Sequence, residues 1–171
     1  MELLKELCEC SGIPGREQRL REIARRELEP VADEITVDAL GNLIARKAAS
    51  PPKGKKKAKS AKKLMIAAHM DEIGFVVSHI DDKGWIRLVP LGGHNTRNMV
   101  AQRVIVCGTK RDLPGLLYPG VRPPHIATPA DLKKDLQISD FFVDLCLPAK
   151  KVKEEVEVGA MVVIDRQFAE I

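Results

Sequence analysis

The sequence predicts an α/β protein with two units, an α/β layer and an all-β unit that forms a small barrel or sandwich. Helical and hairpin patterns fill residues 3–46 and lead to a continuous apolar run at 64–68. From 75 to 164 the chain instead shows short strand-like runs separated by turn residues. We therefore place the α/β unit at 1–71, the β unit at 72–160 and a return toward the first unit at 161–171.

The first unit is expected to begin with two helices and a hairpin. Residues 3–10 and 16–28 carry apolar side chains three and four positions apart, which is typical of amphipathic helices. Residues 34–38 alternate as a half-buried strand, and 43–46 form its return strand after a turn containing glycine and asparagine.

The apolar run Leu64–Ala68 does not alternate between apolar and polar residues. Such a run predicts a strand covered on both faces, in the interior of an α/β sheet. It ends in His69 and Asp71. Polar residues at the carboxyl end of a buried strand lie where open α/β sheets bind ligands.

The second unit is expected to be built from short strands. Turn residues separate them, most clearly Asp81–Gly84, where Asp and Gly satisfy the dihedral angles of a hairpin turn. The expected strands are 75–80, 85–89, 103–107, 116–118 and 141–145, followed by a short helix near 148–156 and a last strand at 161–164.

The positive net charge of the chain comes from one segment. The 171 residues include 28 basic and 24 acidic side chains, a net charge of +4. Residues 51–63 contain seven lysines and no acid, and without them the balance is 21 against 24, or −3. This segment is typical of a disordered, solvated loop. Lysines can also bind phosphates, so a nucleic-acid-binding tail is the alternative. It is the weaker one, because the segment has no arginine or aromatic residue to recognise or stack on bases.

The sequence argues against a membrane or exported protein. Its longest uncharged apolar stretch, 64–68, is far shorter than the ~20 residues of a membrane-spanning helix. Charges at Glu2, Lys5 and Glu6 interrupt what would be the apolar core of a signal peptide. Four cysteines show no CxxC pair, and we interpret them as reduced thiols of a cytoplasmic protein.

His69 and Asp71 are the candidate site residues. In a strand their side chains project to the same side, into the crevice past the strand end. Imidazole is a good zinc ligand, and a carboxylate that accepts its other N–H fixes the tautomer. The pair therefore predicts a histidine metal ligand oriented by an aspartate, and a polar strand cap is the alternative.

Other acidic and histidine residues are interpreted mainly as structural. Glu154 and Glu155 lie among lysines and are expected to form surface ion pairs. Asp165 could end a strand near the crevice as a further ligand. The remaining histidines are assigned to a strand (His79) and to loops (His94 and His125), with a partner's site as the alternative for His94.

Leu64–Phe75 resembles the first metal-site motif of the family 42 metallopeptidases. These include glutamyl and deblocking aminopeptidases, the tetrahedral TET enzymes and members labelled endoglucanase. The similarity extends along nearly the whole chain, through residues 11–17, 38–45, 90–93, 102–104, 138–145 and 158–165.

The resemblance implies an αβα metallopeptidase-like catalytic layer with an inserted β-barrel used for dimerisation. It implies a peptide substrate that loses its N-terminal residues, and two divalent metal ions, zinc or cobalt, in each complete site. His69 then corresponds to a metal ligand, and Asp71 to the catalytic-site carboxylate that orients it.

The resemblance also implies an incomplete site. The family's bridging aspartate, its glutamate pair and its remaining aspartate and histidine would follow Ile171. We therefore expect the chain alone to be inactive. It would form a homo-oligomer through the β unit, with a separate chain as a possible source of the missing half. The alternative function is that of a catalytically incomplete dimerisation or assembly subunit, or a remnant of such an enzyme.

Overall fold

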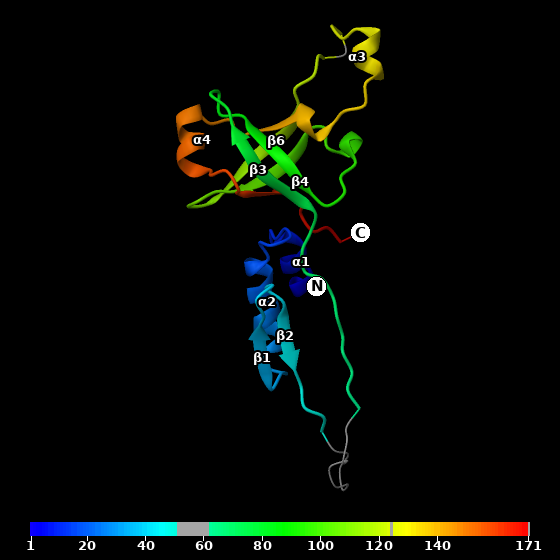
Figure 1. Cartoon of the computed structure of the whole chain (residues 1–171), viewed down its shortest axis with the longest axis vertical. Helices are drawn as coiled ribbons and strands as arrows, with labels where there is room; N and C mark the ends of the chain where they lie inside the picture. The colour runs from blue at the N-terminus through cyan, green and yellow to red at the C-terminus, as the bar shows by residue number, and fades with distance from the viewer. Residues whose placement is uncertain (51–61, 124, 171) are drawn as a thin grey trace.

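A computed structural model describes residues 1–50, 62–123 and 125–170 of the chain. A β-barrel forms one end of the molecule, and a smaller unit of helices and a hairpin lies beneath it (Figure 1). The predicted lysine-rich loop 51–63 lies outside the described residues, except for Lys62 and Lys63, which are exposed. Within the described ranges, every helix is too short or too polar to cross a membrane.

The small unit confirms the predicted helices and hairpin. Helix α1 covers Glu2–Glu9 and helix α2 covers Gln18–Leu28. Strands β1 (Glu34–Val37) and β2 (Leu43–Arg46) pair antiparallel. Leu20 and Ile23 are the buried residues of α2, in agreement with its predicted apolar stripe. Local periodicity was sufficient to predict this unit.

The second unit is a closed six-strand barrel, which confirms the predicted mixed α/β fold with a small β-barrel. Its strands follow the order β3-β4-β7-β6-β5-β8, and every pair is antiparallel. The strands are β3 (Gly74–Ile80), β4 (Ile86–Leu91), β5 (Gln102–Cys107), β6 (Asp112–Pro119), β7 (Phe141–Asp144) and β8 (Met161–Ile164). The other elements are η1 (Thr96–Asn98), α3 (Pro129–Lys133), η2 (Ile138–Asp140) and α4 (Ala149–Glu155).

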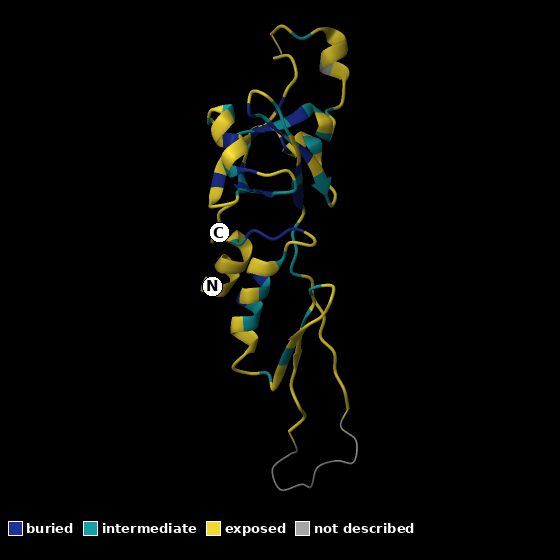
Figure 2. Ribbon diagram, turned by 60° about the vertical axis from the view of Figure 1, so that its left-hand side comes forward, coloured by how far each residue is buried: buried dark blue, intermediate teal, exposed yellow. Residues whose placement is uncertain are grey.

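The main hydrophobic core fills the barrel. Alternate residues of the strands point inward, as in the burial pattern of β7, where Phe141 and Val143 are fully buried. Figure 2 shows the buried residues gathered in the barrel and at its lower end, while the hairpin is largely exposed. The barrel therefore holds most of the buried apolar surface of the described chain.

The barrel extends further along the chain than the sequence suggested. We placed the end of the β unit at 160, but β8 pairs with both β3 and β5. Val162 lies opposite Phe75 on one side and Val106 on the other. A barrel needs a strand at this position to leave no open edge, so the β unit ends at Ile164.

The predicted covered strand at Leu64–Ala68 is wrong. These residues have no regular secondary structure, and Leu64, Met65 and Ile66 are 87, 86 and 88% exposed. A fully apolar strand needs neighbouring strands along its edges and layers on its faces. No strand in the described part of the chain pairs with this segment, which runs alone from the small unit toward the barrel (Figure 1).

The two units meet where the turn after α1 contacts the barrel. Ile13 is fully buried and packs with Met161 and Val163 of β8. Gly74 lies directly against it, since a Cβ at this position would stand 2.4 Å from Ile13 Cγ2. Arg19 of α2 adds a two-bond ion pair to Asp112 at the start of β6, with N–O distances of 2.5 and 2.9 Å.

Matched isoleucine substitutions test the correction at residues 64–68. Ile86→Ala removes a fully buried side chain and should lower the free energy of unfolding by about 2–5 kcal/mol. Ile66→Ala removes a side chain that is 88% exposed and should change it by less than about 0.5 kcal/mol. Urea denaturation measures both. A large loss for Ile66→Ala would contradict the exposed position of this segment.

Removing the Arg19 guanidinium should loosen α2 from the barrel. The hydrogen bonds from Arg19 hold the pKa of Asp112 below its ordinary value. The ion pair therefore stabilises the folded chain fully above the unfolded pKa of ~3.9. This contribution to the free energy of unfolding is lost as the pH falls through the lower folded pKa of Asp112. The two side chains are 45 and 38% exposed, so Arg19→Gln should cost only about 0.5–1 kcal/mol at neutral pH.

Hydrogen exchange can localise this effect. Arg19→Gln should speed amide exchange in α2 at pH 7 and leave the barrel strands unchanged. Arg111→Gln is the matched control, because its ion pair with Glu155 joins two parts of the barrel unit. Equal effects of the two substitutions on α2 would contradict a role for Arg19 in joining the units.

Candidate functional site

His69 and Asp71 lie on the segment that enters the barrel. The backbone N–H of Glu72 donates to the Gly12 carbonyl at 2.8 Å. Two residues later the chain begins β3 at Gly74. The main chain after Asp71 is therefore held by the turn between α1 and α2 and by the barrel, although residues 64–68 before it are exposed.

The ring of His69 faces the aspartate as the sequence predicted. Its Nδ1 atom lies 3.0 Å from the Asp71 carbonyl oxygen and 3.2 Å from the carboxylate Oδ1. Both partners accept hydrogen bonds, so Nδ1 carries the hydrogen and Nε2 presents a lone pair. The His69 side chain is 84% exposed, and that of Asp71 is 36% exposed. The lone pair on His69 Nε2 is therefore accessible to a metal ion.

A cavity of about 210 Å³ adjoins the pair. Its walls come from three separated parts of the chain: the N-cap of α2, the hairpin turn and the segment before β3. The lining residues are Glu17, Leu40, Gly41, Asn42, Ala68, His69, Met70 and Asp71.

The hairpin turn forms a well-defined wall of this cavity. Asp38 Oδ1 accepts hydrogen bonds from the backbone N–H groups of Leu40 and Asn42, at 3.0 and 2.9 Å. Asn42 Nδ2 donates to the other carboxylate oxygen at 2.8 Å, and the hydrogen bonds from Asn42 lower the pKa of Asp38. Gly41 adopts φ +88°, a conformation that favours glycine.

Sequence reasoning assigned these residues to a turn and missed their place beside His69. The turn signal was visible in Gly41 and Asn42, but turn chemistry describes local geometry only. Residues 41 and 69 are brought together by the fold, across the lysine-rich segment.

The pair can supply one ligand of a metal site. His69 Nε2 fits a divalent ion, and Asp71 holds the ring in the required tautomer. Catalytic zinc sites use about three protein ligands. No group of three or more histidine, cysteine, aspartate or glutamate side chains that could hold a metal ion occurs in the part of the chain that the structure describes.

The other acidic candidates form ion pairs. Glu155 accepts from Arg111 at 2.9 Å, and Glu154 pairs with Lys151 at 3.3 Å, which confirms the predicted surface roles. Asp165 lies 3.8 Å from Arg103 and does not line the cavity at His69.

The remaining histidines lie away from His69. His79 and His125 are exposed, on β3 and in a loop. His94 stacks on Phe75 with ring centroids 4.2 Å apart, and its Nε2 lies 3.0 Å from the Gly74 carbonyl oxygen. It therefore packs against the start of β3.

The four cysteines are free thiols. Burial raises the pKa of Cys107 on β5 to about 11, which agrees with an inert, half-buried thiol. Cys146 is exposed in the turn that follows β7, with φ +54°. The strand ends two residues earlier, at Asp144.

Comparison with known proteins identifies relatives along the whole chain. The family model of the M42 glutamyl aminopeptidases matches residues 41–171. A putative aminopeptidase FrvX from Escherichia coli K12 is 34% identical over 174 residues, which cover 99% of this chain and 45% of that protein.

Two solved structures of similar sequence share the fold. A TET aminopeptidase from the marine sediment archaeon Thaumarchaeota archaeon SCGC AB-539-E09 is 32% identical, with a TM-score of 0.84 over 100% of this chain and 46% of its own. The TET1 peptidase of Pyrococcus horikoshii, described as assembling into a tetrahedron or a large octahedral shell, is 30% identical, with a TM-score of 0.78 over 98% of this chain and 47% of its own. The chain thus spans about half the length of these relatives.

Proposed function

Because the chain belongs to the M42 glutamyl aminopeptidase family, we propose that it carries part of the active site of a metal-dependent aminopeptidase. The enzyme would hydrolyse N-terminal residues from peptides in the cytoplasm. The observation that supports this proposal most directly is the contact between His69 Nδ1 and Asp71, which leaves His69 Nε2 accessible as a ligand.

In the proposed site, His69 binds one of two divalent ions, zinc or cobalt. When bound, such ions activate a water molecule and polarise the scissile carbonyl group. Asp71 has a positioning role, because its two oxygen contacts hold the imidazole at Nδ1 and keep the lone pair on Nε2. The hairpin wall at Leu40–Asn42 bounds the space beside this ligand and limits how a peptide could approach.

The rest of the proposed site lies outside this arrangement. The described residues offer one histidine nitrogen and one nearby carboxylate, whereas a two-ion site needs bridging and terminal ligands on both ions. Further ligands, and a carboxylate to accept a proton from water, would come from additional polypeptide or from a separate chain. By itself, the arrangement at His69 is not sufficient for turnover.

An assembly role is the second candidate, and an apolar surface on the barrel favours it. Val100, Tyr118 and Val121 are exposed and line a cavity of about 520 Å³ together with Leu136. Exposed clusters of apolar and aromatic side chains are typical of protein–protein interfaces. We propose a second copy of this chain as the occupant, in line with the assemblies described for the Pyrococcus horikoshii relative.

Metal titration of the chain tests the proposed site. Cobalt(II) should perturb the imidazole NMR signals of His69 at lower concentration than those of the other three histidines. Asp71→Asn should weaken cobalt binding about 10- to 100-fold, because the ring loses the carboxylate that orients it. His69→Ala should remove the binding, and His125→Ala, at an exposed loop position, should leave it unchanged.

Two results would contradict the metal proposal. One is cobalt affinity that His69→Ala does not reduce. The other is metal-dependent hydrolysis of an aminoacyl p-nitroanilide that continues at full rate in the same variant.

The oligomeric state tests the assembly surface. The unmodified chain should form dimers or larger species in multi-angle light scattering. Val121→Asp places a charge in the apolar cavity and should weaken association at least tenfold. Val158→Asp is the matched control, because Val158 is exposed elsewhere on the barrel unit and does not line this cavity. A monomeric unmodified chain, or equal effects of both variants, would contradict the proposed interface.

A further inference from the structure

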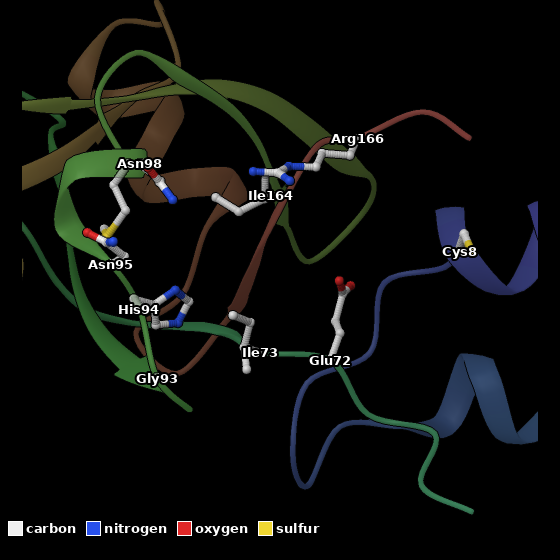
Figure 3. Close-up of a pocket in the computed structure, with 10 residues that line it drawn as sticks. Cys8, Glu72, Ile73, Gly93, His94, Asn95, Asn98, Ile164 and Arg166 are labelled. Atoms are coloured by element: carbon white, nitrogen blue, oxygen red, sulfur yellow. The ribbon is translucent and has the colours of Figure 1, made fainter. Parts of the chain in front are cut away.

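A second cavity lies between the lower end of the barrel and the small unit (Figure 3). Its volume is about 360 Å³, within the range of small-molecule sites, and it shares no lining residue with the cavity at His69. Its polar lining residues include Glu72, His94, Asn98 and Arg166.

One side of this cavity offers hydrogen-bond acceptors. Glu72 is half-buried, and its side chain extends from the segment before β3 into the cavity (Figure 3). No basic side chain of the described residues forms an ion pair with it, and burial raises the pKa of its carboxyl group. An unpaired, partly desolvated carboxylate is unfavourable unless a cation approaches it.

His94 adds a second acceptor. Its Nε2 contacts the Gly74 carbonyl, an acceptor only, so Nε2 carries the hydrogen and Nδ1 holds the lone pair. Stacking on Phe75 keeps the ring in place. Glu72 and His94 are therefore two acceptors that line the same cavity.

The other side of the cavity offers donors. Arg166 follows β8, and its guanidinium group lies over the cavity near Ile164 (Figure 3). It forms no ion pair with an acidic side chain among the described residues, whereas most arginines of the barrel unit do. The amide of Asn98 lies on the same cavity. Guanidinium and amide N–H groups both donate hydrogen bonds to carboxylates.

We propose that this cavity binds a free α-amino acid. Its ammonium group would contact Glu72 and Nδ1 of His94, and its carboxylate would contact Arg166 and Asn98. The apolar lining residues Ile73, Met99 and Ile164 favour an aliphatic side chain. A zwitterion satisfies both unpaired charges at once, which neither a simple cation nor a simple anion does.

The proposal does not depend on the proposed peptidase activity. No residue at His69 takes part in it, so His69→Ala should leave amino-acid binding unchanged. Free amino acids are also the products that an aminopeptidase releases. The cavity is therefore a candidate product-binding site if the proposed function is correct.

Calorimetric titration of the full chain with L-leucine tests the proposal. We expect saturable binding that weakens at least tenfold for N-acetyl-L-leucine, which lacks the ammonium group, and for L-leucinamide, which lacks the carboxylate. Leucyl-leucine tests whether the N-terminal residue of a peptide can occupy the cavity instead, and it should also bind at least tenfold more weakly than leucine.

Matched variants assign the two ends of the ligand. Glu72→Gln should weaken leucine and leucinamide, whereas Arg166→Gln should weaken leucine and N-acetyl-leucine. Glu22→Gln and Arg25→Gln, on α2 outside the cavity, are the controls and should change nothing. Far-UV circular dichroism and the melting temperature verify that each variant is folded.

The proposal is overturned if leucine does not bind, or if it binds equally to the Glu72 and Arg166 variants. It is likewise overturned if leucinamide binds as tightly as leucine, since the carboxylate would then have no role. Equal affinity for leucyl-leucine would also overturn it, since the cavity would then accept a peptide and not only a free amino acid.

Discussion

The contact between Ile13 and Gly74 holds the small unit against the barrel. Ile13 is fully buried against the outside of the barrel, at a place where any side chain larger than hydrogen on residue 74 would collide with it. This close packing places the turn between α1 and α2 beside the segment before β3, where the backbone N–H of Glu72 donates to the Gly12 carbonyl. A short apolar contact thus decides where the chain enters the barrel and, with it, where the residues before β3 lie.

Both candidate sites depend on this junction. His69 and Asp71 precede it and face the hairpin turn, whereas Glu72 faces the cavity beneath the barrel. Adjacent residues of an extended segment point in opposite directions, so one short stretch serves two cavities. The segment is stable at its barrel end because the barrel contains the main hydrophobic core, and its earlier part, 64–68, lacks such support.

The predictions that succeeded relied on local periodicity, and those that failed required partners distant in sequence. Helix α2, the hairpin and the barrel strands all show their periodicity within the sequence, and each was predicted within a few residues. The covered strand at 64–68 was wrong because an apolar run shows what a segment could bury and not whether a partner is present. The boundary at 160 was misplaced for a related reason, since closure by β8 depends on strands distant in sequence.

The sequence by itself determined the local elements, the metallopeptidase resemblance and the pairing of His69 with Asp71, because residues two apart on an extended chain are neighbours whatever the rest of the fold does. Only the tertiary structure decided that the hairpin turn bounds that pair and that Glu72 and Arg166 share a cavity. These groupings arise from packing between distant segments. No local pattern of residues records which segments will meet, because that outcome depends on the burial achieved by the whole fold.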